Sequence, residues 1–244
     1  ESGILYITGN SNHTGDFTIA ENARLQVTGN HNFDATSNIM GVGDFRVVGN
    51  TTNLDGNLEI GGDITVSGGT LNVNQSITSN QLITSGGTLN INAEVNSEII
   101  NQSGGTTNIN VIESFREGTI SGGIFNSKEE TTISDLDWTG GIISGRGKLT
   151  ITDEFNLTNT TKGLTGIDIE TQGVTNWDSG TIQIYTNQSQ WTNTGTFNII
   201  GARFIDNFNP VLIFDNQGTI NKTDTGTATL EATINNNGLI NVES

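Results

Sequence analysis

The chain has 244 residues, and its 26 acidic residues outnumber its 9 basic residues to give a formal net charge of −17. That charge repels polyanions and anionic lipid surfaces at long range, which argues against nucleic acid as a partner. The chain has no cysteine and lacks the apolar run of roughly 18 residues that a membrane-spanning helix requires, so the sequence predicts neither disulfides nor membrane insertion.

Residues 1–67 are marked by Gly-Asn pairs. These pairs, Gly9–Asn10, Gly29–Asn30 and Gly49–Asn50, follow one another at equal intervals. Between them lie short segments in which apolar and polar residues alternate, such as Leu25–Val27 and Phe45–Val47. Alternation with a period of two is typical of β-strands with one buried face. We therefore expect coils of about 20 residues built from short strands.

The most regular part of the chain is residues 68–157, where Gly-Gly pairs recur at a constant interval. The pairs begin at positions 68, 86, 104, 122 and 140, and the first three open the related segments GGTLNVN, GGTLNIN and GGTTNIN. Glycine suits tight corners because it adopts positive φ angles without steric cost. A repeat of about 18–20 residues is too short for two packed helices and matches one coil of a parallel β-helix.

Alignment of the Gly-Gly repeats predicts which side chains stack inside the coils. In GGTLNVN, Leu71 and Val73 take one face of the strand while Thr70, Asn72 and Asn74 take the other. Coils about 4.8 Å apart bring equivalent side chains into contact. Two inward columns follow, one of Leu71, Leu89, Thr107, Phe125 and Ile143, and one of Val73, Ile91, Ile109, Ser127 and Gly145.

In residues 158–244 the repeat is looser, and Thr158–Gln188 is the least regular stretch. The repeat survives as NTGTFN from Asn193, NQGTIN from Asn216 and NNGLIN from Asn236. We therefore predict one continuous all-β domain over residues 1–244, a single-stranded parallel β-helix (β-solenoid) with about 18–20 residues per coil.

A right-handed coil is favoured, because the aliphatic residue at every sixth position that marks left-handed helices is missing. The two ends of the sequence read as ordinary repeats. We therefore expect capping segments outside this sequence, and end-to-end or neighbouring-domain contacts.

Several segments of the second half are similar to a known repeat pattern. They are WTGGIISGRGKLTITDEFNLT (Trp138–Thr158), NWDSGTIQI (Asn176–Ile184), WTNTGTFNI (Trp191–Ile199) and FDNQGTINKTDTGTATLEATINNNGLINV (Phe214–Val242). These segments resemble the repeats of bacterial haemagglutinin-like and filamentous surface adhesins. The resemblance carries over no catalytic or ligand residue.

This resemblance implies a secreted protein at the bacterial cell surface that attaches to a host or environmental surface, with glycans among its candidate partners. The expected function is therefore that of a non-catalytic structural or adhesive segment, which mediates attachment or acts as a rigid spacer. The alternative is a carbohydrate-binding or carbohydrate-active β-helix of the polysaccharide lyase or hydrolase kind.

One outward row of the regular repeats is a candidate ligand-binding surface. It consists of two adjacent columns, Thr70, Thr88 and Thr106 beside Asn72, Asn90 and Asn108. Hydroxyl and amide groups stacked about 4.8 Å apart on a flat face present a regular polar lattice to a glycan, or to ice. In the alternative interpretation, the asparagines only hydrogen-bond each coil to the next.

An enzyme of the lyase or hydrolase kind needs paired carboxylates or a base beside carboxylates. The closest arrangement is Asp135 and Asp137, two positions apart, with further charged residues on adjacent coils: Arg146, Lys148, Asp153 and Glu154. A solvated outer face with ion pairs between coils is the favoured interpretation, and no catalytic residue is assigned. A cleft would need long loops, for which only Thr158–Gln188 and Ala202–Pro210 are long enough.

No pattern predicts a cofactor or a dedicated metal site. His13 and His31 lie about one coil apart but lack further ligands, so both are expected at surface corners. Asp44 and Asp63 occupy matching places before their corners, where weak calcium binding is an option.

Three tryptophans, Trp138, Trp177 and Trp191, precede glycine-containing corners. Aromatic faces can stack on sugar rings. Packing over the corner is the favoured interpretation here.

Overall fold

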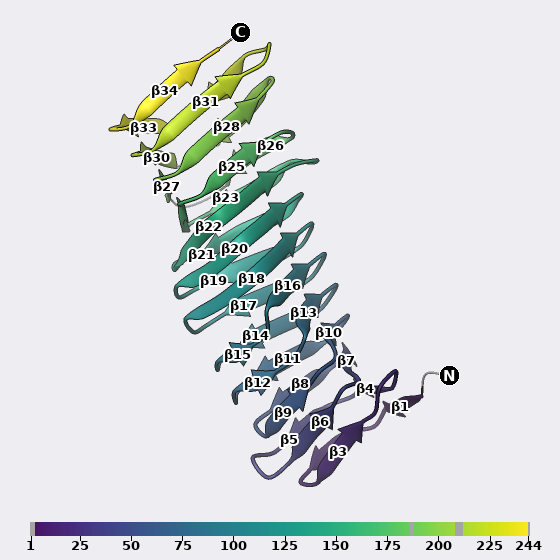
Figure 1. Ribbon diagram of the computed structural model, residues 1–244. Helices are drawn as coiled ribbons and strands as arrows, with labels where there is room; N and C mark the ends of the chain where they lie inside the picture. The colour runs from purple at the N-terminus through teal and green to yellow at the C-terminus, as the bar shows by residue number, and fades with distance from the viewer. Residues whose placement is uncertain (1–2, 186–187, 208–211, 244) are drawn as a thin grey trace. The chain divides into compact units, whose positions relative to one another are not determined.

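The computed structural model describes residues 3–185, 188–207 and 212–243, which form β-strands and no helix (Figure 1). Each strand pairs in parallel with the equivalent strand of a neighbouring coil. The predicted parallel β-solenoid is therefore confirmed. The chain divides into two compact units, Glu1–Phe115 (unit 1) and Arg116–Ser244 (unit 2).

Three sheets form the three sides of the coils in unit 1, and each of the coils from β1 to β15 contributes one strand to each sheet. The first sheet contains β1 (Ile4–Ile7), β4 (Arg24–Thr28), β7 (Asp44–Gly49), β10 (Ile64–Val66), β13 (Gln81–Thr84) and β16 (Ile99–Gln102). The second contains β2 (Ser11–His13), β5 (His31–Phe33), β8 (Thr51–Leu54), β11 (Thr70–Val73), β14 (Thr88–Ile91) and β17 (Thr106–Ile109). The third contains β3 (Asp16–Ile19), β6 (Asn38–Gly41), β9 (Asn57–Ile60), β12 (Ile77–Thr78) and β15 (Val95–Asn96).

Strand register in unit 1 confirms the predicted coil lengths. Leu25 pairs with Phe45, and this step equals the interval between successive Gly-Asn pairs. Leu71 pairs with Leu89, and this shorter step equals the interval between successive Gly-Gly pairs. All four side chains are fully buried, at 2% exposure or less, which places these columns inside the solenoid.

A glycine is required at the second position of each Gly-Gly corner. Gly87 has a φ of +65°, and a Cβ atom built there would lie 2.3 Å from the carbonyl oxygen of Gly69 on the preceding coil. The same carbonyl accepts a hydrogen bond from the amide of Thr88 at 2.7 Å. Both the positive φ and the close approach of two coils exclude a side chain, which explains the repeated Gly-Gly signature.

Unit 2 has two sheets, a long sheet and a short sheet. β18 (Glu113–Ile120) begins in unit 1 and ends in unit 2. The long sheet contains β20 (Thr131–Trp138), β22 (Lys148–Leu157), β24 (Asp168–Thr171), β25 (Val174–Trp177), β27 (Ser189–Asn193), β28 (Thr196–Ile200), β30 (Leu212–Asn216), β31 (Thr219–Thr223), β33 (Thr233–Asn236) and β34 (Leu239–Val242). The short sheet contains β19 (Ile124–Ser127), β21 (Gly141–Gly145), β23 (Lys162–Thr165), β26 (Thr181–Ile184), β29 (Arg203–Asn207) and β32 (Ala228–Leu230).

The long sheet covers two sides of each coil in unit 2. The first half of β22 pairs with β24 and its second half with β25, so one strand turns the corner between two sides without interruption. From β25 the same side of the coils continues through β28, β31 and β34, which lie side by side in the green-to-yellow part of Figure 1. Coil length rises here, since Trp191 pairs with Phe214, a longer step along the sequence than that from Leu71 to Leu89.

The stretch expected to be least regular, Thr158–Gln188, is regular in the structure. Its described residues form four strands, β23 to β26, each in parallel register with a neighbouring coil. These residues therefore form coils of the predicted solenoid, and the long loop that a cleft would need is not formed by the described residues of this stretch. In the second stretch named as long enough for a cleft loop, Ala202–Pro210, Arg203–Asn207 form strand β29, and 208–210 lie outside the described residues.

Two Asn-x-Gly motifs of unit 2 turn their asparagines inward, since Asn193 and Asn216 are completely buried. The Nδ2 of Asn193 donates to the Gly195 carbonyl at 3.3 Å and to the Oδ1 of Asn216 at 2.8 Å. The Nδ2 of Asn216 in turn donates to the Oδ1 of Asn236 at 2.6 Å. Each amide thus satisfies a corner carbonyl and links its coil to the next.

Candidate binding surface

The outward row predicted in residues 68–110 has the expected geometry. Thr70, Thr88 and Thr106 are in register on β11, β14 and β17, and so are the asparagines at the adjacent outward positions. All of these side chains are half-buried. The structure adds a further coil to the row, since Thr51 and Asn53 of β8 pair with Thr70 and Asn72.

The asparagines of this row bind one another. The Nδ2 of Asn72 donates to Asn53 at 2.8 Å, that of Asn90 to Asn72 at 2.7 Å, and that of Asn108 to Asn90 at 2.8 Å. A second, parallel amide ladder follows two positions further on, and its members are Asp55, Asn74, Asn92 and Asn110. Each amide inside these ladders donates one N–H group to one neighbour and accepts with its oxygen from the other. The ladders therefore join the coils, and a ligand would bind through the second N–H group and second oxygen lone pair of each amide and through the threonine hydroxyls.

Unit 2 carries a third outward ladder that sequence reasoning did not identify. It runs along the second half of the long sheet, with donor–acceptor distances of 2.9 to 3.2 Å, through Asp137, Asn156, Asn176, Asn198, Asn221 and Asn241. The signal in the sequence was an asparagine at the same position of successive strands, at steps that vary from one coil to the next. The unequal coil lengths concealed it.

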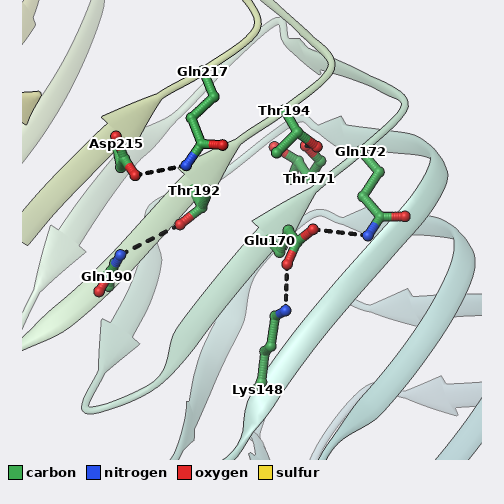
Figure 2. A network of polar contacts seen from close by, with 9 residues as sticks. All are labelled: Lys148, Glu170, Thr171, Gln172, Gln190, Thr192, Thr194, Asp215 and Gln217. Carbon is green, nitrogen blue, oxygen red and sulfur yellow. Dashed lines mark hydrogen bonds and ion pairs between the residues drawn. The ribbon is translucent and has the colours of Figure 1, made fainter. Parts of the chain in front are cut away.

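The other half of the long sheet presents a mixed polar face (Figure 2). Lys148 forms an ion pair with Glu170, and the Nε2 of Gln172 donates to the same carboxylate at 2.8 Å. Both interactions lower the pKa of Glu170, with the hydrogen bond from Lys148 as the largest cause. On the following coils the pairs are Gln190 with Thr192 and Gln217 with Asp215.

A polar cavity of about 680 Å³ opens on the short sheet of unit 2. Asn126, Ser144 and Thr165 lie in register on β19, β21 and β23 and form one wall. Two basic side chains, Lys128 and Arg146, border the same cavity. Both are exposed. Lys128 and Arg146 are separated by one interval of the Gly-Gly repeat, a spacing from which no site was predicted.

The charged residues proposed for lyase or hydrolase chemistry do not form a single site. Asp135 and Asp137 are both exposed on β20, on the same side of the strand, as predicted. The Asp137 carboxylate, however, begins the amide ladder by accepting from Asn156 at 3.1 Å. Lys148 is paired with Glu170, while Arg146 borders the cavity on the other sheet.

The tryptophans cannot act as sugar platforms in this structure. Trp138, Trp177 and Trp191 are all at 0% exposure. The indole N–H of Trp177 donates to the Gly180 carbonyl at 3.1 Å, which ties this ring to its corner from inside. The preference for packing over stacking on a ligand is confirmed, although the rings fill the core rather than lie over the corners.

The expected surface positions of the histidines were wrong for His31, which is only 1% exposed and lies on β5. Its Nδ1 is 3.2 Å from the Nε2 of His13, and the His13 ring stacks on Phe33 with centroids 4.3 Å apart. Burial lowers the pKa of both imidazoles. His31 is thus part of the core of unit 1, and His13 lies half-buried beside it.

The carboxylates of Asp44 and Asp63 already accept protein hydrogen bonds. Asp44 accepts from the amide of Asp63 at 3.1 Å, and Asp63 accepts from the side chains of Asn80 and Gln81 at 2.9 and 2.8 Å. These donors link successive coils, as the amide ladders do. Among the described residues, no group of three or more His, Cys, Asp or Glu is placed to hold a metal ion.

A buried acidic residue that sequence reasoning missed is Glu113, whose side chain lies beside the last strand of the third sheet of unit 1. Ile77 and Val95 occupy equivalent positions on β12 and β15. The amide of Ile77 donates to the backbone carbonyl of Glu94 at 3.2 Å. One coil later the amide of Val95 donates instead to the Oε1 of Glu113 at 2.9 Å. The sequence offered one indication of this, because Glu113 follows Val95 by one interval of the Gly-Gly repeat and so occupies an inward position.

The fold and these surfaces define the chain as a parallel β-solenoid with polar side-chain ladders on its outer faces. Comparisons with protein-family models, with curated proteins and with solved structures found no match. No helix that could span a membrane occurs in the part of the chain that the structure describes.

Proposed function

We propose that this chain is a non-catalytic structural and adhesive segment of a secreted bacterial surface protein. In this role it holds an outer polar face in a fixed geometry for attachment, or acts as a rigid spacer. The observation that carries the proposal is the set of outward ladders in which asparagine side chains of successive coils bind one another.

The ladders support this role for a physical reason. Side chains that are hydrogen-bonded to the coils before and after them lose rotamer freedom on folding and not again on binding. A face of this kind is pre-organised for a repetitive partner such as a polysaccharide. It also resists local opening, because each coil is joined to its neighbours by backbone and side-chain hydrogen bonds together.

Beads coated with the chain test the proposal on surfaces of different polysaccharides. We expect retention on at least one polysaccharide surface above the level of beads coated with an unrelated acidic protein. A reducing-end assay on the same polysaccharides in solution is expected to show no new chain ends. Release of oligosaccharides would contradict the proposal and favour the carbohydrate-active alternative.

A carbohydrate-binding module is the second candidate function. The cavity bordered by Lys128 and Arg146 favours it, since a recess lined by hydroxyl and amide side chains can take a saccharide without any chemical step. The two candidates differ in where the ligand lies, on the extended ladder face or in this recess.

A further inference from the structure

The cavity on the short sheet owes its shape to a change of side chains along one outward column. In unit 1 the equivalent kind of column is a continuous amide ladder, with Asn72, Asn90 and Asn108 in contact. In unit 2 the column starts with Asn126 and continues with the shorter side chains of Ser144 and Thr165. The Ser144 Oγ is 3.5 Å from the Oδ1 of Asn126, at the limit of a hydrogen bond. The shorter side chains leave the recess open.

Lys128 and Arg146 occupy equivalent positions on adjacent coils at the edge of this recess. They directly follow Ser127 and Gly145, which are register partners. Like charges on adjacent strands repel each other and reduce stability. The chain has only 9 basic residues, so the placement of two of them at equivalent positions of adjacent coils requires a compensating interaction or a function.

No structural role accounts for these two cations. Lys148 has Glu170 as a partner, and the ammonium group of Lys162 donates to the carbonyl of Thr160 at 2.8 Å. Within residues 3–185, 188–207 and 212–243, neither Lys128 nor Arg146 has an ion-pair or hydrogen-bond partner. The described residues that line the recess also include no carboxylate.

We propose that this recess, with Lys128 and Arg146 at its edge, binds the anionic group of an acidic saccharide, either a carboxylate or a sulfate. Arginine presents a planar fork that matches both groups, and lysine adds a second charge. The side chains of Asn126, Ser144, Thr165 and Gln188 supply donors and acceptors for sugar hydroxyl groups. A volume of about 680 Å³ is large enough for a saccharide unit and exceeds the need of a single inorganic anion.

The overall charge of −17 is compatible with a local anion site. The chain as a whole repels anions, but this repulsion is largely screened beyond about 8 Å at physiological ionic strength. Only an anion that reaches the recess meets the two cations directly. Binding should therefore weaken as the salt concentration rises, because the contacts are partly exposed.

Calorimetric titration of the full chain tests this assignment with three oligosaccharides of equal length. One is an oligomer of galacturonic acid, one a sulfated galactose oligomer and one a neutral galactose oligomer. We expect binding of at least one acidic oligomer and none of the neutral one. The acidic oligomer that binds more tightly identifies the anionic group.

Two variants, Lys128→Gln and Arg146→Gln, remove one cation each from the exposed edge. Each is expected to lower the affinity for the acidic oligomer by at least about tenfold, the effect of losing one hydrogen bond to a charged group. Arg116→Gln is the matched control, because it makes the same charge change at an exposed position on β18 outside the recess. It should leave the affinity unchanged.

The assignment is overturned if no acidic oligomer binds, or if the Lys128→Gln/Arg146→Gln double variant binds as the unsubstituted chain does. It rests on the second candidate function, saccharide binding in this recess, and the adhesive role can fail separately. Beads that adhere equally well with the double variant, together with calorimetric binding that the double variant keeps, would leave adhesion standing and remove this site. Calorimetric binding that depends on the two cations, without any bead retention, would keep the site and remove the adhesive role.

Discussion

In unit 1, the carboxyl group of Glu113 accepts a strand amide hydrogen bond of the kind that the backbone carbonyl of Glu94 accepts one coil earlier. It accepts the amide hydrogen bond of Val95, and the side chain is only 5% exposed. Burial raises the pKa of Glu113 to about 7, and the charge of Glu94 acts in the same direction, while the bond from Val95 opposes the shift. The Glu113 side chain therefore supplies the acceptor for the Val95 amide on the last strand of the third sheet.

The stability of the chain should depend on pH through this group. Between pH 4.5 and about 7 the folded chain keeps a proton on Glu113 that the unfolded chain has lost. The free energy of unfolding therefore falls as pH rises across that window. A Glu113→Gln variant keeps an acceptor oxygen without the charge, and we expect it to be up to about 3 kcal/mol more stable than the unsubstituted chain above pH 7.

Urea unfolding at several pH values measures this difference. The gain should shrink through pH 4.5 and vanish well below it, where the glutamic acid is neutral in both states. Glu59→Gln, an exposed change on β9, controls for the altered net charge. A constant offset between Glu113→Gln and the unsubstituted chain at all pH values would contradict the assigned proton.

At the scale of strands and corners, the same amide chemistry has two uses that differ in burial. Asn216 lies inside a corner at 0% exposure and bonds to Asn193, Asn236 and two carbonyls. Asn198 lies on the outer face of β28 in the third outward ladder. Water can replace the partners of an outward amide but not those of a buried one.

Asn216→Ala and Asn198→Ala should therefore have unequal effects. We expect the buried change to lower the free energy of unfolding by about 1 to 3 kcal/mol, because the corner carbonyls lose their donor away from water. The outward change should cost less than about 1 kcal/mol. Urea unfolding with comparison of midpoints and slopes gives both values, and equal losses would show that burial does not separate the two ladders.

The strands of this protein were far easier to predict than the interactions between them. The constant step of the Gly-Gly pairs placed Leu71, Leu89 and the outward threonines in the correct register, because a corner that excludes a side chain must recur once per coil. The inward asparagines and Glu113 were missed. Nothing in a local motif tells whether an amide faces water or a corner carbonyl, since both positions follow the same alternation. The pairing of Lys128 with Arg146 was missed because both residues directly follow strands rather than lie at predicted outward positions on them.

At the scale of the whole molecule, each coil of unit 1 is an interchangeable layer. Thr88 and Thr106 are register partners, and each follows a Gly-Gly corner. In a repeat fold of this kind, stability is approximately a sum of contributions from single coils and their interfaces. Removal of one complete layer should therefore leave the others able to stack.

Deletion of residues 88–105 tests this layered organisation. It joins Gly87 to Thr106, so that β17 takes the place of β14 beside β11. We expect circular dichroism and cooperative thermal unfolding like those of the full chain, with a modest loss of stability. Deletion of residues 88–96, half a coil, is the matched control and should disrupt folding, because it puts the strands of later coils on the wrong sides.

The three tryptophans of the chain all lie in unit 2, where the rings are completely shielded from solvent. Emission from indole therefore reports on one half of the protein alone, with a short-wavelength maximum expected as long as that half is intact. Far-ultraviolet dichroism records both halves. A difference between the two melting curves would reveal, without any label, whether the halves lose their structure in one event or in succession.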